Sequence, residues 1–205
     1  MMTDGGFSFS IHQDAIFLIC GHDLDRPLAT GFCFIKPEWI VTTKHAVIDL
    51  DLPREELWLL PRHGAPLTGS IVFVHPTHDL AVLRIEGPSP CDVPLFPSFE
   101  EYTGLKGLLA CGYAPSLSSV EESRYTLHLN HVPSYEREKR IRDTGEEALI
   151  TFDAPWMEGG HSGGPVFGEG GGVVAVLIEK VQNNDGLVSA RATSILHLLR
   201  FLTFR

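Results

Sequence analysis

Short segments in which apolar and polar residues alternate are the feature that most restricts how this chain can fold. A period of two places successive side chains on opposite faces of a strand, whereas a helix needs a period of 3.6. The segments are bounded by Gly, Pro and Asp, and almost no helical pattern precedes residue 190. The pattern therefore predicts an all-β protein built mainly from antiparallel strands.

The predicted strands form two groups of six. The first group lies near residues 15–20, 31–35, 39–43, 57–60, 67–74 and 80–85, and the second near 107–112, 124–132, 148–153, 164–167, 172–181 and 187–191. Between the groups, Pro88, Pro90, Pro94 and Pro97 resist a sheet interior because each lacks a backbone donor. We expect two domains, residues 1–96 and 97–205.

Two further elements are predicted in the second half. Ile195, Leu198, Leu199 and Leu202 repeat at helical spacing after Ser194, whose hydroxyl can cap a helix. A short helix near 194–204 should therefore close the chain by packing on the β structure. The charged segment 136–147 is predicted to be a solvated hairpin tip, with a regulatory contact as the alternative.

Charge and hydropathy limit the partners. The 205 residues include 16 Lys and Arg against 26 Asp and Glu, and the formal charge of -10 has the wrong sign for binding a phosphate backbone. The longest apolar runs have six residues, far fewer than the ~20 that cross a bilayer. The first ten residues lack the pattern of a secretory signal. We expect no nucleic acid, no membrane partner and a cytoplasmic location.

Three segments carry residue types suited to nucleophilic catalysis. Ser162 lies in GGHSGGP, where closely spaced glycines suggest a backbone bent to direct its N–H groups inward; a plain glycine-rich turn is the alternative. His45 follows a β-branched strand in WIVTTKHAV, and Asp79 precedes a buried strand in HPTHDLAVLRI. Taken singly, His45 would be a structural histidine and Asp79 a turn residue. Together they supply a nucleophile, a base and a group to orient the base.

In the order His45, Asp79, Ser162, these segments resemble the trypsin-like serine proteases, in particular the bacterial trypsin-like peptidases. TTKHAV is similar to the family's TAxHxV, HDLAVLRI to its DLALL segment and GGHSGGP to its GxSGGP. The resemblance covers most of the chain, from Thr30 to the last strand near 191. It implies two six-stranded antiparallel β-barrels of the chymotrypsin type and a serine endopeptidase that cleaves protein or peptide substrates.

The resemblance also implies a role for each residue. Ser162 would attack the scissile carbonyl, His45 would take and return the proton, and Asp79 would hold the imidazole in the required tautomer. The N–H groups of Gly160 and Ser162 would form the oxyanion hole. The substrate pocket would be lined by Trp156, Ile178, Glu179 and Lys180.

Two departures from the family affect specificity and control. Trp156, six positions before the nucleophile, would lie at the base of the pocket, so a small or medium apolar residue is expected before the cut. One extra residue between Asp153 and Ser162 could instead bring Glu158 inward and reverse this preference. His161 replaces an Asp that pairs with a newly cut N-terminus, so we expect control by a regulatory partner on the loops around 136–147 and 154–159 instead.

Two other functions fit parts of the pattern. GHSGG also satisfies the G-x-S-x-G elbow of α/β-hydrolases, with Ser162, Asp185 and His197 as a formal triad. That elbow needs a helix directly after the serine, which the glycines and Pro165 oppose. The second alternative is a catalytically weak, protease-like binding or scaffold module, in which Lys180 or Trp156 obstructs the cleft.

Neither a metal nor another cofactor is predicted. His75 and His78 could bind zinc with Asp79, but Pro76 lies between the histidines and Asp79 already has a catalytic role. The run GEGGGV lacks the Lys-Ser/Thr of a phosphate loop and lies between two predicted strands, so it is expected to be a hairpin turn.

Overall fold

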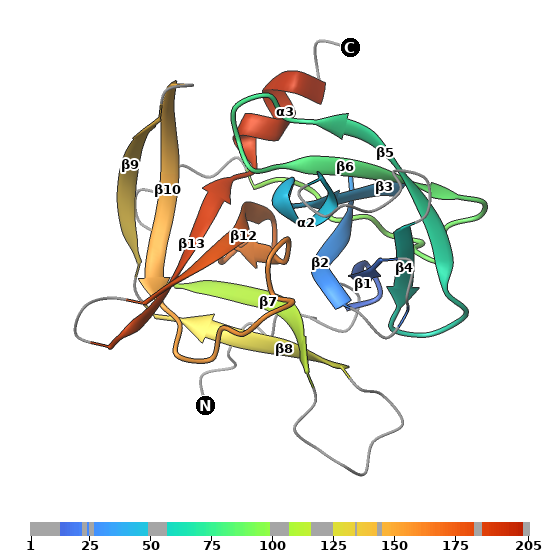
Figure 1. Cartoon of the computed structure of the whole chain (residues 1–205), viewed down its shortest axis with the longest axis horizontal. Helices are drawn as coiled ribbons and strands as arrows, with labels where there is room; N and C mark the ends of the chain where they lie inside the picture. Colours follow the sequence, from blue (N-terminus) through green and yellow to red (C-terminus); the bar gives the residue numbers. More distant parts are fainter. Residues whose placement is uncertain are drawn as a thin grey trace.

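The first six strands close into a barrel, seen on the right of Figure 1. The computed structural model describes residues 13–21, 24, 27–48, 57–98, 107–115, 125–133, 135–142, 145–182 and 186–202. The barrel strands are β1 (Ile16–Cys20), β2 (Pro27–Phe34), β3 (Lys36–Thr42), β4 (Leu57–Pro61), β5 (Leu67–Val74) and β6 (Ala81–Glu86). They are antiparallel in the order β1-β2-β3-β6-β5-β4, which confirms the first predicted group of six.

The remaining strands form one antiparallel sheet of seven. They are β7 (Leu108–Pro115), β8 (Tyr125–Val132), β9 (Glu136–Arg142), β10 (Gly145–Asp153), β11 (Pro165–Phe167), β12 (Val173–Gln182) and β13 (Val188–Ser194). Their order is β8-β7-β11-β12-β13-β10-β9, and over the described residues the sheet is not closed. The prediction of a second six-stranded barrel was therefore wrong in strand number and in closure.

The chain between β8 and β9 explains this difference. The two edge strands of the sheet are consecutive in sequence: β8 pairs with β7, and after Pro133 the chain pairs with β10 as β9. A proline resists continued strand pairing because it has no N–H to donate. The chain therefore connects the two edges without a hydrogen-bonded ladder between them.

The strand β9 lies in the segment that was predicted to be a hairpin tip. A hairpin does form here, since β9 and β10 pair from Glu136 opposite Thr151 to Arg142 opposite Gly145. The prediction was wrong about the strands that it joins, because β8 pairs with β7 and not with β10. Backbone pairing requires no apolar side chain, so a hydrophobic pattern does not reveal a strand as charged as this one.

The segment between β6 and β7 contacts both groups of strands. Leu95 forms a parallel bridge with Phe34 of β2, and Pro97 forms one with Val173 of β12. The boundary expected between residues 96 and 97 falls in this segment.

The closing helix α3 (Leu196–Leu202) lies at the top of Figure 1 against β5. The hydroxyl of Ser194 accepts a hydrogen bond from the N–H of Leu196 at 3.3 Å, as the predicted cap requires. Leu198 is fully buried in the larger core cluster, and the Phe201 ring lies 5.8 Å from that of Phe73 on β5. The predicted helix is thus confirmed, and it packs on the barrel. No helix in the described part of the chain is long and apolar enough to cross a membrane.

Candidate active site

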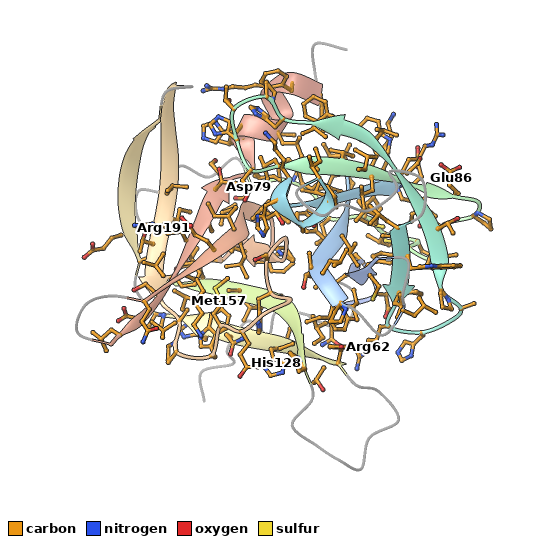
Figure 2. All side chains as sticks on the ribbon, viewed as in Figure 1. Arg62, Asp79, Glu86, His128, Met157 and Arg191 are labelled. Carbon is orange, nitrogen blue, oxygen red and sulfur yellow. The ribbon has the colours of Figure 1, made fainter. Side chains whose placement is uncertain are left out.

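His45 and Asp79 are brought together from two neighbouring barrel strands. β3 ends at Thr42, and His45 opens the single-turn helix α2 (His45–Ile48); Asp79 lies two residues before β6. The Nδ1 of His45 is 2.6 Å from Oδ2 of Asp79, and the backbone N–H of His45 donates to Oδ1 at 2.9 Å. Figure 2 shows Asp79 beside α2. Both carboxylate oxygens of Asp79 therefore bind His45, and this fixes the orientation of the imidazole ring. Asp79 occupies Nδ1, so Nε2 is the ring nitrogen that it does not contact.

The turn that carries Asp79 is organised by the side chain of His75. The Nδ1 of His75 accepts hydrogen bonds from the backbone N–H groups of Thr77, at 3.2 Å, and His78, at 3.0 Å. The turn is closed by a hydrogen bond from the N–H of His75 to the carbonyl of Leu80 at 2.9 Å. His75 thus has a structural role, which is not the metal-binding role considered for it above.

His75 is 1% exposed, and its ring lies against α3. Its centroid is 4.3 Å from the ring of Phe201 and 4.5 Å from that of His78, and His78 stacks on His197 at 3.8 Å. Burial, followed by the nearby His78 and His197, lowers the pKa of His75 to about 4. The imidazole is therefore neutral near pH 7, as its acceptor role at Nδ1 requires. Within the described residues, no group of three His, Cys, Asp or Glu side chains is placed to hold a metal.

Ser162 lies in a tightly constrained glycine turn. The N–H of His161 donates to the carbonyl of Glu158 at 3.4 Å, and of the two central residues of this turn only Gly160 has a positive φ, of 101°. A positive φ at the third position alone is typical of a type II turn, which favours glycine there. Gly163 has a φ of 86°, and a Cβ on it would clash with the carbonyl oxygen of Thr30.

Backbone contacts hold the Ser162 turn against the barrel close to His45. The N–H of Thr30, on β2, donates to the carbonyl of Ser162 at 2.7 Å. The hydroxyl of Thr42, three residues before His45, would also meet a Cβ on Gly163. The barrel residues that precede His45 and the turn that contains Ser162 are therefore in contact.

The hydroxyl of Ser162 donates to the carbonyl oxygen of Ile178 at 3.2 Å. Ile178 lies at an irregularity of β12, where the register with β13 passes from Leu177 to Glu179. The single proton of Ser162 is therefore directed at β12 in this conformation. At 3.2 Å the bond is longer than the 2.7–2.8 Å usual for a hydroxyl donor, so it is weak.

The two N–H groups that are expected to form the oxyanion hole are not bound to an acceptor within the described part of the chain. Among the described residues, the backbone N–H groups of Gly160 and Ser162 donate no hydrogen bond, whereas those of His161, Gly163 and Gly164 all do. The carbonyl oxygens of Gly160 and Ser162 are both bound by Thr30. Two donors on one turn thus remain available for an oxyanion.

His161 is buried below the Ser162 turn. Its Nδ1 lies 3.1 Å from the N–H and 3.2 Å from the carbonyl oxygen of Glu158. Its Nε2 is buried and has no hydrogen-bond partner in the described part of the chain. Burial lowers the pKa of His161, so the ring is neutral at neutral pH.

The residues predicted to line the pocket have different environments. The half-buried Trp156 stacks on Phe152, with centroids 6.4 Å apart, and lies 5.5 Å from the ring of His161. Ile178 is 2% exposed and Lys180 is exposed. Glu179 accepts a hydrogen bond from Arg191 of β13 at 3.2 Å, and this cation offsets its charge.

The α/β-hydrolase alternative is wrong. Its elbow requires a helix directly after the nucleophile. Here Gly163 and Gly164 lead instead into β11, which begins at Pro165. His197 lies on α3 and stacks on His78, while Asp185 lies outside the described residues.

Sequence reasoning missed three groups that shape this site. They are the backbone N–H of His45, which supports Asp79, the carbonyl of Ile178 and the side chain of Thr30. The first two are backbone groups and leave no signal in side-chain identity. A polar residue within a strand of buried apolar side chains was the available signal for Thr30, which is fully buried.

Comparisons with known proteins identify a family whose match includes His45, Asp79 and Ser162. Residues 29–176 match the trypsin-like peptidase domain family. No curated protein matches the sequence. Among solved structures, the chain is similar to the MamO protease domain from Magnetospirillum magneticum, with a TM-score of 0.71 and 17% identity, covering 94% of this chain and 98% of that one.

Two further structures have comparable similarity. The active form of the Rv3671c protease from M. tuberculosis has a TM-score of 0.69 and 18% identity, with 95% of this chain and 82% of that chain covered. The HtrA-type protease AlgW with a tripeptide has a TM-score of 0.68 and 18% identity, with 95% and 61% covered. At these identities the structures share the fold, and the family match extends over more than half of the sequence. The chain belongs to the trypsin-like peptidase family.

Proposed function

We propose that this protein is a serine endopeptidase that cleaves protein or peptide substrates through an acyl-enzyme on Ser162. The observation that carries the proposal is the Asp79-bound imidazole of His45, together with a nearby turn on which the N–H groups of Gly160 and Ser162 are unengaged. A base held by a carboxylate, a hydroxyl and two N–H donors are the parts that acyl transfer requires.

The reaction would proceed in two steps. The oxygen of Ser162 attacks the scissile carbonyl carbon while Nε2 of His45 takes the hydroxyl proton, and the N–H groups of Gly160 and Ser162 stabilise the oxyanion. The C–N bond then breaks, and His45 gives the proton to the leaving amine. In the second step His45 takes a proton from a water molecule, whose oxygen attacks the acyl carbon; the bond between that carbon and the Ser162 oxygen then breaks, and His45 returns the proton to Ser162. Asp79 stabilises the charged imidazole in both steps.

One observation favours the alternative of a catalytically weak binding module. The hydroxyl of Ser162 donates to Ile178, and catalysis requires it to turn toward His45 instead. Because that bond is 3.2 Å long, exchanging it for a shorter bond to an imidazole costs little. We therefore favour the enzyme, and the alternative becomes an outcome of the test.

The test is hydrolysis of a peptide pool together with labelling by a fluorophosphonate probe. Ser162→Ala should abolish both, since loss of the nucleophile typically lowers kcat by ~10⁶. Ser70→Ala, which changes a half-buried serine on β5 that is hydrogen-bonded to Glu86, should leave both unchanged. EDTA should have no effect. Folded wild-type protein that neither cleaves nor reacts would support the binding module, and hydrolysis that persists in Ser162→Ala would exclude the triad.

A further inference from the structure

Thr30 occupies a central position between the barrel and the second sheet. It is fully buried on β2, and its N–H, its carbonyl and its hydroxyl all form hydrogen bonds. The N–H donates to the carbonyl of Ser162 at 2.7 Å, and the hydroxyl donates to the carbonyl of Gly160 at 2.7 Å. The hydroxyl also accepts from the N–H of Tyr113 on β7 at 2.8 Å, while the Thr30 carbonyl accepts from the hydroxyl of Thr42 at 2.8 Å.

These bonds converge on the two residues whose N–H groups lack an acceptor. Gly160 and Ser162 are each held through their own carbonyl oxygen, and in both cases the donor belongs to Thr30. The carbonyl of a residue lies in the peptide plane that follows it, and that plane is joined through the Cα atom to the plane that carries the residue's own N–H. Holding the carbonyl therefore fixes one of these two adjoining planes and narrows the directions that the N–H can take. One residue of the barrel thus restrains both donors of the second sheet.

The hydroxyl of Thr30 is important because the hydrogen bond that closes the turn, from the N–H of His161 to the carbonyl of Glu158 at 3.4 Å, does not involve the backbone groups of Gly160 itself. Its φ of 101° is easily adopted by glycine and just as easily abandoned. The backbone carbonyl of Tyr113 lies 2.7 Å from the position a Cβ on Gly160 would take, so Gly160 cannot be stiffened by a larger residue. A hydrogen bond to its carbonyl is the means of restraint that this packing leaves.

We propose that Thr30 is a positioning residue that preorganises the oxyanion hole, its hydroxyl holding Gly160 and its N–H holding Ser162. The inference rests on the proposed function. Thr30 does not contact the substrate or take part in proton transfer. It contributes by holding the N–H donors in place before the oxyanion forms, which is the condition under which such donors are most effective.

The decisive variant is Thr30→Val, which keeps the β-branched shape and the backbone N–H but removes the hydroxyl. Thr30→Ser restores the hydroxyl. The matched control is Thr193→Val on β13, because the Thr193 hydroxyl is also fully buried but has no hydrogen-bond partner within the described residues. Circular dichroism and thermal unfolding establish that each variant is folded at the assay temperature.

Thr30→Val should lower kcat by about 10- to 100-fold with KM changed less than threefold, since loss of a whole donor costs about 10²–10³. Its affinity for a peptide boronic acid, which forms an oxyanion-like adduct with the serine, should fall in parallel. The pH dependence of kcat should be unchanged, because His45 and Asp79 are untouched. Thr30→Ser should stay within about threefold of wild type, as should Thr193→Val. General loosening of the site would instead raise KM or shift the pH profile.

Backbone hydrogen exchange at Tyr113 and Gly163 tests the same inference without requiring activity. In Thr30→Val the N–H of Tyr113 should lose its protection, and that of Gly163, bonded to Leu177 at 2.7 Å, should exchange faster. Unchanged hydrogen exchange, or a wild-type kcat, in Thr30→Val would overturn the positioning role of Thr30 and leave the proposed function standing. A wild-type protein without activity or probe labelling would overturn the proposed function, and hydrogen exchange would still decide whether Thr30 holds the turn.

Discussion

Acidification should destabilise this protein through a single buried histidine, His75. Its pKa in the folded protein is about 4, mainly because of burial, against 6.5 for an ordinary histidine. Below pH 6.5 the unfolded chain takes up a proton at this position that the folded protein does not bind. The free energy of unfolding therefore falls as the pH drops from about 6.5 to about 4, and this contribution levels off at lower pH because both states are then protonated.

The size of the effect follows from the two pKa values. At pH 5 the difference in proton binding costs about 2 kcal/mol of folding free energy, compared with about 0.2 kcal/mol at pH 7. Protonation would also remove the acceptor at Nδ1 that orders the turn before Asp79, and would place a cation next to His78, His197 and Lys44. The loss of stability is thus coupled to the residue that orients the candidate base.

His75→Asn separates this contribution from other acid-sensitive groups. An asparagine oxygen can accept from the N–H two residues ahead, as Nδ1 does from Thr77, and it does not titrate. The variant loses the ring contacts with Phe73 and Phe201 and should be less stable at pH 7. The informative quantity is therefore the change in unfolding free energy between pH 7 and pH 5, measured by urea denaturation.

That change should be about 2 kcal/mol smaller in His75→Asn than in wild type. His63→Asn, which alters an exposed histidine of the barrel, is the control and should keep the wild-type acid dependence. Equal losses of stability in wild type and His75→Asn would show that the ring of His75 is accessible to protons, and the reasoning from its burial would then be wrong.

Two further predictions concern catalysis. Asp79→Asn should leave the fold intact, because an amide oxygen can still accept the hydrogen bond from the N–H of His45. It should lower kcat by about 10⁴, because the amide favours the wrong imidazole tautomer. A loss of kcat below tenfold would argue against the orienting role of Asp79. Profiling of cleaved peptides should find a small or medium apolar residue before the cut, since Trp156 supplies no carboxylate and Glu179 is paired with Arg191. Cleavage mainly after Arg or Lys would contradict this preference and make Glu158→Gln the next variant to test.

Local patterns predicted the barrel well because its strands are short, mainly apolar segments bounded by turn residues, such as the fully buried β1, IFLIC. Closure of the second sheet would require its two edge strands, β8 and β9, to pair with each other, and a local pattern does not tell which neighbour each of them pairs with. The edge strand β9 was missed because its residues, EREKRIR, contain one apolar side chain. Pro133 can be read from the sequence, but its effect on strand pairing depends on which strands β8 and β9 pair with in the folded protein.

The candidate site divides in the same way. His45, Asp79 and Ser162 lie in recognisable local segments, and the structure confirms that His45 and Asp79 meet. The group that supports Asp79 is a backbone N–H 34 residues away, and Gly160 is bound by a hydroxyl 130 residues away. Such partners are determined by packing between the barrel and the second sheet, so a sequence pattern cannot identify them.

His161 suggests why the turn at Ser162 can be ordered without a buried ion pair. A buried carboxylate at this position would need a cation, because an unpaired buried charge is costly. A neutral imidazole avoids that cost, and its Nδ1 accepts a hydrogen bond from the backbone N–H of Glu158 within the same turn. Its ring lies against Trp156 and leaves no room for a side chain on Gly112 of β7. Packing below the turn and the hydrogen bonds of Thr30 beside it thus replace electrostatic attraction, so the geometry of the two N–H donors should depend little on salt concentration.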